Sequence, residues 1–250
     1  MKVKFNGTYS YQRDIGKIRV ANEDECKVIV NTYGNVLMMV ADGMGGYKKG
    51  DYASLETITY IKDSFIAHGK FFTLTGFVSW LKKAVRNANK SVFFKSERDP
   101  GYKGMGSTLA VCCIFKNKLI VLNIGDSRSY VCKDGRLIQL TEDQTYVNYL
   151  YRSGKIQEHE MKTHPKRHVL TNAIGLYANA SFDLKIYDYE GETIFICSDG
   201  LYNNVDVPDI LNILKSSETT DQKVSSLISL ANYNGGTDNI CMTLWETTND

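Results

Sequence analysis

One local pattern recurs along this chain and constrains its fold more than any other feature. A short apolar run, typical of a buried β-strand, ends in an aspartate that is followed at once by glycine or serine. Such runs end at Asp42, Asp126 and Asp199, and Asp238 directly precedes one further apolar run. An ionised carboxylate at the tip of a buried strand is unfavourable unless a positive charge lies beside it. If the fold brings these tips together, they predict a shared cation site.

The tips offer oxygen ligands only. Gly43 and Gly200 follow two of the aspartates, and a glycine lets the backbone approach closely enough for a carbonyl to join the site. Oxygen ligands without histidine or cysteine suit Mg²⁺ or Mn²⁺ and not Zn²⁺ or copper. A single Asp-Gly pair more often marks an ordinary turn. Asp134-Gly135, between two strand-like runs, is assigned to a hairpin without chemistry.

Runs of predicted strands are interrupted by predicted pairs of helices, which favours an α+β fold with layered sheets over alternating βαβ units. Alternating apolar residues predict strands at residues 27–30, 36–40, 108–115, 118–124, 129–132, 137–140, 182–189, 192–197 and 239–245. Helical spacing predicts helices at residues 51–68, 74–97, 208–215 and 220–231, and a short helical piece at 147–151. The helix at 51–68 is expected to bury Leu55, Ile58, Ile61 and Phe65.

The composition describes a globular chain. With 250 residues, 43% hydrophobic content and no low-complexity linker, residues 1–250 are expected to form a single domain. The net charge of +2 gives no reason to expect a nucleic-acid partner. The apolar runs are too short to cross a bilayer, and the first residues do not resemble a signal peptide, so we expect no membrane partner and a cytoplasmic location. The six cysteines are interpreted as small core residues.

Seven segments in fixed order resemble the metal-dependent protein phosphatases, the type 2C or PPM family, and its bacterial branch in particular. They are residues 19–24 (RVANED), 40–46 (VADGMGG), 104–110 (GMGSTLA), 124–128 (IGDSR), 164–175 (HPKRHVLTNAIG), 197–201 (CSDGL) and 236–240 (GTDNI). The resemblance implies a four-layer α-β-β-α sandwich, with two antiparallel sheets flanked by helix pairs. It also implies hydrolysis of phosphoserine and phosphothreonine by a metal-activated water, without a covalent intermediate.

The resemblance also implies a set of metal ligands. Asp42 would bridge two Mn²⁺ or Mg²⁺ ions, and the carbonyl of Gly43 would bind one of them. Asp199 and Asp238 would hold one ion, and Glu23 the other. The residues alone do not distinguish Mn²⁺ from Mg²⁺, since both prefer oxygen.

Three further residues receive roles by the same resemblance. Asp126, together with Asp199, would help to bind a third ion. Asp24 would contact metal-held waters or support the ligands. Arg19 would bind the substrate phosphate, a role that suits a forked and permanently charged guanidinium. On its own, an arginine four residues before Glu23 is more often half of a surface ion pair.

The chain also departs from the family. Met44 and Tyr47 stand where family members carry histidines, which leaves the proton donor open. Residues 143–180 correspond to the family's variable flap beside the active site. Phosphorylated proteins are the expected partners, together with a cognate serine/threonine kinase. Two alternatives are a hydrolase of small phosphate esters and an inactive relative, although the ligand residues of an active enzyme are all present.

Overall fold

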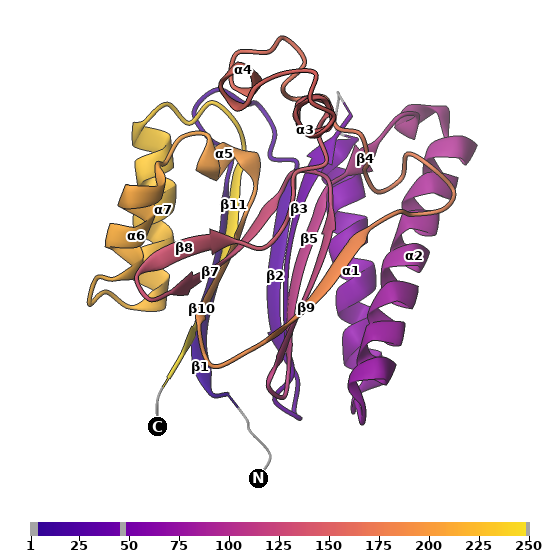
Figure 1. Cartoon of the computed structure of the whole chain (residues 1–250). Coiled ribbons are helices and arrows are strands. Elements are labelled where there is room, and N and C mark those ends of the chain that lie inside the picture. The colour runs from indigo at the N-terminus through magenta and orange to yellow at the C-terminus, as the bar shows by residue number, and fades with distance from the viewer. Residues whose placement is uncertain (1–4, 46–48, 249–250) are drawn as a thin grey trace.

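The computed structural model describes residues 5–45 and 49–248. Two antiparallel β-sheets face each other, and helices cover the outer face of each sheet (Figure 1). The arrangement is a four-layer α-β-β-α sandwich, so the expected fold class is confirmed.

The first sheet has the strand order β2-β3-β5-β6-β9. Its strands are β2 (Asp24–Val30), β3 (Val36–Met44), β5 (Leu109–Phe115), β6 (Lys118–Ile124) and β9 (Asp183–Asp188), and β4 (Gly106–Ser107) pairs with the end of β3. The second sheet has the order β1-β11-β10-β7-β8. Its strands are β1 (Gly7–Asp14), β11 (Ile240–Thr247), β10 (Thr193–Cys197), β7 (Arg128–Lys133) and β8 (Arg136–Gln139).

Two long helices cover the first sheet and two shorter ones cover the second (Figure 1). The long pair is α1 (Gly50–His68) and α2 (Leu74–Arg98), and the short pair is α6 (Val207–Leu214) and α7 (Thr220–Tyr233). Short elements connect the layers: η1 (Pro100–Tyr102), α3 (Tyr146–Arg152), α4 (Glu158–Met161) and α5 (Asp199–Tyr202). Among the described residues, no helix has the length and apolar character needed to cross a membrane.

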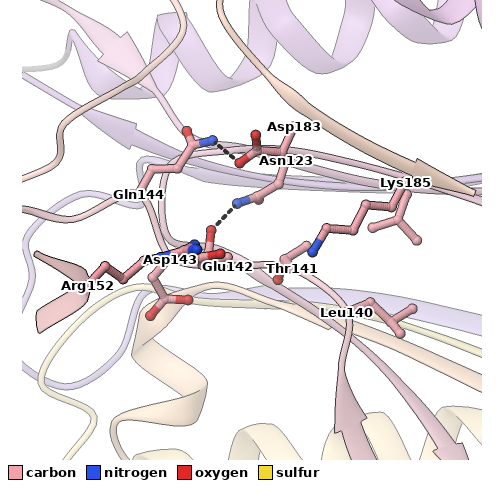
Figure 2. Close-up of a pocket in the computed structure, with 10 residues that line it drawn as sticks. Asn123, Leu140, Thr141, Glu142, Asp143, Gln144, Arg152, Asp183 and Lys185 are labelled. Atoms are coloured by element: carbon pink, nitrogen blue, oxygen red, sulfur yellow. Dashed lines mark hydrogen bonds and ion pairs between the residues drawn. The ribbon is translucent and has the colours of Figure 1, made fainter. Parts of the chain in front are cut away.

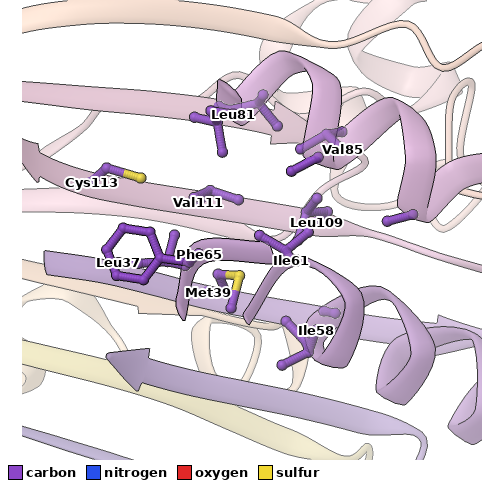
Figure 3. Packing of buried hydrophobic residues seen from close by; sticks show 14 of the residues in the cluster. Leu37, Met39, Ile58, Ile61, Phe65, Leu81, Val85, Leu109, Val111 and Cys113 are labelled. Atoms are coloured by element: carbon purple, nitrogen blue, oxygen red, sulfur yellow. The ribbon is translucent and has the colours of Figure 1, made fainter. Parts of the chain in front are cut away.

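Three apolar clusters hold the four layers together, one at each interface between layers. Strand β5 is buried along its whole length because its two faces belong to different clusters. Leu109, Val111 and Cys113 face the helices, where Figure 3 shows them beside Ile61 and Phe65 of α1. The alternate residues of β5 face the second sheet. This double burial explains why the strand is a continuous apolar run.

The prediction that Leu55 belongs to the buried face of α1 was wrong, because this side chain is 52% exposed. The residues that α1 buries are Ala53, Ser54, Thr57, Ile58, Ile61 and Phe65, beside Gly50. At 100° per residue, Leu55 points away from this stripe. Small and hydroxyl side chains therefore occupy the part of α1 that lies against the sheet near its first turns.

Strand β1 was not predicted. It pairs along its length with β11, from Gly7 opposite Thr247 to Asp14 opposite Ile240. Only Ser10 of this strand is buried. An edge strand of this kind is specified mainly by backbone hydrogen bonds, so its polar sequence carries no apolar alternation to detect.

Two smaller expectations are confirmed. Asp134 and Gly135 form the tight turn between β7 and β8, with φ values of 50° and 72°, as in a type I′ hairpin. All six cysteines are free, five of them are buried, and Cys132 is half-buried. They are packing residues.

Candidate metal centre

The acidic residues singled out from the sequence come together from both sheets. Asp24 begins β2 and lies directly opposite Asp42, near the end of β3. Asp199 follows β10, and Asp238 lies just before β11 in the second sheet. Asp126 follows β6 and is 9% exposed. Burial and then the charges of the other four raise the pKa of Asp42, so the five carboxyls form one electrostatic cluster.

Backbone contacts fix the position of Asp42. Its N–H donates to the hydroxyl of Thr108 at 2.9 Å, and the N–H of Thr108 donates to the Asp42 carbonyl at 2.8 Å. The Ser107 hydroxyl donates to the same carbonyl at 3.0 Å. None of these bonds uses the carboxylate. They fix the backbone of Asp42 and leave its carboxylate oxygens available to a ligand.

Glu23 is held at the start of helix α1. Its carbonyl accepts from the Ser54 hydroxyl at 2.5 Å and from the N–H of Gly43 at 3.1 Å. Its Oε1 accepts from the N–H of Gly50, the first residue of α1, at 3.2 Å. The positive end of the helix favours an ionised carboxylate here, although burial raises the pKa of Glu23 above its usual range.

A close approach between Gly43 and Gly50 places Glu23 beside the tip of β3. A Cβ added to Gly43 would lie 2.1 Å from the Gly50 carbonyl oxygen and 2.5 Å from that of Glu23. A Cβ on Gly50 would lie 2.8 Å from the Glu23 carboxyl carbon. Only glycine at both positions permits this contact.

Gly43→Ala is therefore expected to separate the tip of β3 from α1 and to lower Mn²⁺-dependent turnover about tenfold or more, with a fall in Tm, because the clash is with backbone that cannot rotate away. Steady-state kinetics and thermal unfolding check this. Gly69→Ala is the control for introducing an alanine, since Gly69 has φ of 67° but no atom within 4 Å of its added Cβ. Backbone strain alone then lowers Tm and leaves turnover unchanged.

The cluster carries more negative charge than the protein itself balances. Burial and then the neighbouring carboxylates raise the pKa of Asp126 to about 7 and that of Asp199 to about 6. Burial raises the pKa of Asp24 to about 8, although the Ser198 hydroxyl donates to its Oδ2 at 2.6 Å. The charges of Asp199 and Asp238 also raise the pKa of Asp24.

Arg19 lies at the rim of the cluster. Its Nη2 donates to Asp238 Oδ2 at 2.6 Å, and its side chain is 50% exposed. This bond, and the charges of Asp42 and Asp199, raise the pKa of Arg19. The ion pair expected for an isolated arginine is thus formed, and its partner is a candidate metal ligand.

The donor set fits a divalent cation in chemistry and charge. Every candidate ligand is an oxygen, and Asp199 Oδ1 is buried without a hydrogen-bond partner among residues 5–45 and 49–248. Within the same part of the chain, no three histidine, cysteine or acidic side chains form a ready-made metal-binding group. Asp238 is turned toward Arg19, and Asp24 toward Ser198. The carboxylates are gathered, but some of them are held by other partners.

Asn239 was missed as a structural support of the site, although it directly follows Asp238. Its side-chain amide donates to the carbonyls of Ile15 and Ala21, both at 2.9 Å, and its Oδ1 accepts from the N–H of Glu23 at 2.9 Å. One buried side chain thus fixes the loop that carries Arg19 and Glu23. The sequence feature that could have indicated this role is the position of Asn239 directly after the candidate ligand Asp238.

A second support connects Asp126 to the start of the flap. Arg128 donates to both carboxylate oxygens of Asp143, its Nη2 at 2.7 Å from Oδ2. The guanidinium lies 3.6 Å from the centre of the Tyr202 ring, and the Tyr202 hydroxyl donates to the Asp126 carbonyl at 3.2 Å. The predicted flap, residues 143–180, contains the helices α3 and α4, of which only the first was expected.

A separate cavity of about 170 Å³ lies between the loop after β8 and strands β6 and β9 (Figure 2). Gln144 donates to Asp183 across it at 2.8 Å, and Asn123 donates to the Glu142 carbonyl at 3.0 Å. None of the candidate metal ligands lines it, so it is distinct from the carboxylate cluster. Met44 is half-buried at the end of β3, and Tyr47 lies outside the described residues.

Comparison with known proteins gives one consistent family. Residues 19–235 match the family described as "Protein phosphatase 2C". The chain is 34% identical to "Serine/threonine phosphatase stp" of Listeria monocytogenes, over 94% of each chain. A Streptococcus agalactiae serine/threonine phosphatase structure is 33% identical with a TM-score of 0.91, covering 97% of this chain and 100% of that one. The catalytic domain of the phosphatase PstP with two manganese ions is 30% identical, with a TM-score of 0.84 and coverage of 97% and 99%. The chain belongs to the protein phosphatase 2C family.

Proposed function

We propose that this chain is a serine/threonine protein phosphatase that depends on Mn²⁺ or Mg²⁺, with residues 1–250 as one catalytic domain. The observation that carries the proposal is the cluster of five carboxyls contributed by both sheets, in which burial and mutual repulsion raise the pKa values of Asp42, Asp126 and Asp199. The family, its serine/threonine phosphatases and a relative holding two manganese ions support the same reading.

The ligand roles are proposals about this chain's residues. Asp42 would be held in common by two ions, of which one would also be bound by the Gly43 carbonyl and Glu23 and the other by Asp199 and Asp238. Mn²⁺ or Mg²⁺ in such a pair supplies a Lewis acid and lowers the pKa of bound water.

Two further residues complete the set. Asp126, beside Asp199, is the candidate ligand for a third ion. Asp24 is 1% exposed and accepts a hydrogen bond from Ser198, and its proposed role is to contact metal-held waters or to support the ligands.

Arg19 is proposed to bind the substrate phosphate. A guanidinium has five N–H donors, and Arg19 uses one of them on Asp238. The other N–H donors of the half-exposed Arg19 side chain can bind a phosphate next to the carboxylates. The positive charge of the guanidinium offsets part of the negative charge of the carboxylates. If Asp238 binds an ion, this ion pair weakens and the guanidinium becomes more available to substrate.

The proton for the leaving alkoxide has no histidine source at the two positions where the family carries one. Met44 stands at the first of these positions and cannot donate a proton, and Tyr47 stands at the second. Water at the site is the proposed donor. We further propose that the substrates are phosphorylated proteins, among them products of a serine/threonine kinase that acts with this phosphatase.

The direct test is hydrolysis of a phosphothreonine peptide with Mn²⁺, with Mg²⁺ and after chelation. We expect turnover with either ion, loss of turnover with excess chelator, and recovery when Mn²⁺ is restored. Small phosphate esters at equal concentration test the alternative substrate class and should give a lower kcat/KM. A soluble, folded protein that hydrolyses none of these substrates with Mn²⁺ would instead indicate an inactive relative.

A further inference from the structure

A groove of about 910 Å³ lies between helices α1 and α2, outside the carboxylate cluster. Helix α1 begins and helix α2 ends at the same end of the molecule, so the two run antiparallel (Figure 1). The groove is lined by aromatic and basic side chains together with small polar ones: Tyr52, Tyr60, Asn87, Lys90, Ser91, Phe94, Lys95, Arg98, Asp99 and Pro100.

The first turn of α1 connects the groove to the support of Glu23. Tyr52 is two residues from Gly50, whose N–H bonds Glu23. The first turn of α1 thus carries both the backbone donor that holds Glu23 and a residue that lines the groove. An extended peptide with its phosphoresidue at the metal centre can therefore place neighbouring residues along α1 and α2.

The charge of the groove is positive. Its lining has three cations, Lys90, Lys95 and Arg98, against one acid, Asp99. Glu56, which accepts a hydrogen bond from the lining residue Ser91 at 2.5 Å, brings the net charge to +1. Asp99 is already paired with Lys95 at 2.9 Å. Elsewhere in the described chain, no acidic side chain forms an ion pair with Lys90 or Arg98.

Aromatic rings lie beside two of the three cations, Arg98 and Lys95. The Arg98 guanidinium lies 5.5 Å from the centre of the Phe94 ring, and Lys95 Nζ lies 4.4 Å from that of Tyr102. Tyr102 packs against Tyr52 with ring centres 4.9 Å apart. Aromatic and arginine side chains are enriched among the residues that contribute most of the binding energy at protein interfaces.

Resting on the proposed function, we infer that the α1–α2 groove docks an acidic segment of the phosphoprotein substrate, next to the phosphoresidue. Glutamate or aspartate side chains pair with Lys90 and Arg98, and apolar atoms of the segment pack on Tyr52, Tyr60 and Phe94. The groove thereby selects phosphosites with acidic neighbours.

The test compares three phosphothreonine peptides of equal length whose flanking residues are acidic, neutral or basic, using the wild type, Lys90→Glu/Arg98→Glu and the control Lys70→Glu/Lys82→Glu. The control makes the same change in net charge outside the groove. We expect the wild type and the control to prefer the acidic over the neutral peptide about tenfold in kcat/KM, the size of two or three exposed ion pairs. The groove variant should lose this preference while its kcat for a small aryl phosphate stays unchanged.

A binding measurement separates this inference from the proposed function. Fluorescence anisotropy of a labelled acidic peptide needs no turnover, and only the groove variant should bind it more weakly. Equal kcat/KM for acidic and basic peptides, or equal binding by the groove variant and the control, would overturn the inference. Tighter binding of a labelled oligothymidylate than of the acidic peptide, lost in the groove variant, would also overturn it and assign the groove to nucleic acid. Failure to hydrolyse the aryl phosphate with Mn²⁺ contradicts only the proposed function.

Discussion

Replacing Asp42 with asparagine is expected to lower kcat for Mn²⁺-dependent hydrolysis of a phosphothreonine peptide about a hundredfold or more, the scale lost when a key electrostatic group is removed. The substitution keeps the size of the side chain and removes one negative charge. The bonds to Thr108 and Ser107 use only the backbone of residue 42, so the tip of β3 keeps its position. The loss therefore reports the charge of the carboxylate and not a local collapse.

The chain provides a matched control for this substitution. Asp134 is also an aspartate followed by glycine after a strand, but it forms the β7–β8 turn with φ of 50°. Asparagine accepts this left-handed conformation, so Asp134→Asn should leave both kcat and Tm unchanged. Asp199→Asn should resemble Asp42→Asn. Full activity in either of these two variants, with normal folding by circular dichroism, would contradict the proposed metal centre.

The contrast between Asp42 and Asp134 shows how much of the site could be predicted from the sequence. The two have the same local pattern, and the difference lies in what surrounds them after folding. Asp42 lies opposite Asp24 across a ladder and near carboxylates from the other sheet, whereas Asp134 belongs to a hairpin turn. Local chemistry predicted Asp42, Asp126, Asp199 and Asp238 as candidate ligands, but Glu23 and the convergence of the strand tips came from the family resemblance.

The errors have a common physical origin. Strong apolar periods predicted α2, β5 and β6 to within a residue or so of their bounds. Strand β1 has no such period because it is an exposed edge, and Leu55 lies outside the stripe that α1 buries. Supports such as Asn239 act through polar contacts that join residues more than 200 positions apart. Periodicity reports burial, so it cannot predict contacts of that kind.

The stability of the metal-free protein is expected to fall as the pH rises, and Mn²⁺ should remove this dependence. The pKa of Asp126 is raised from its usual 3.8 to about 7, chiefly by burial, and that of Asp24 to about 8. Below pH 3.8 both carboxyls are protonated in the folded and unfolded states. Above it the unfolded chain loses these protons while the folded chain retains them, so the folded state loses stability until the pH exceeds about 8.

Raising one such pKa from 3.8 to about 7 corresponds to about 4 kcal/mol for the ionised form, and coupling between the carboxyls reduces the sum over the cluster. For a chain of this length, Tm without metal should therefore fall by about 5–10 °C between mildly acidic pH and pH 8.5. Excess Mn²⁺ should raise Tm most at the alkaline end, because cation binding replaces the protons. Thermal unfolding at a series of pH values, with chelator or with Mn²⁺, measures both effects.

Asp126→Asn separates this explanation from a general effect of pH. The variant lacks one of the titrating groups, so without metal its Tm should depend less on pH and should exceed that of the wild type at alkaline pH. Asp134→Asn removes a carboxylate from an exposed turn and should follow the wild type at every pH. The explanation is contradicted if the Tm of Asp126→Asn and that of Asp134→Asn depend on pH in the same way. It is also contradicted if the Tm of the metal-free wild type rises between pH 5 and 8. Burial and repulsion between the carboxylates together make the empty cluster unfavourable and provide the free energy with which it would bind divalent ions.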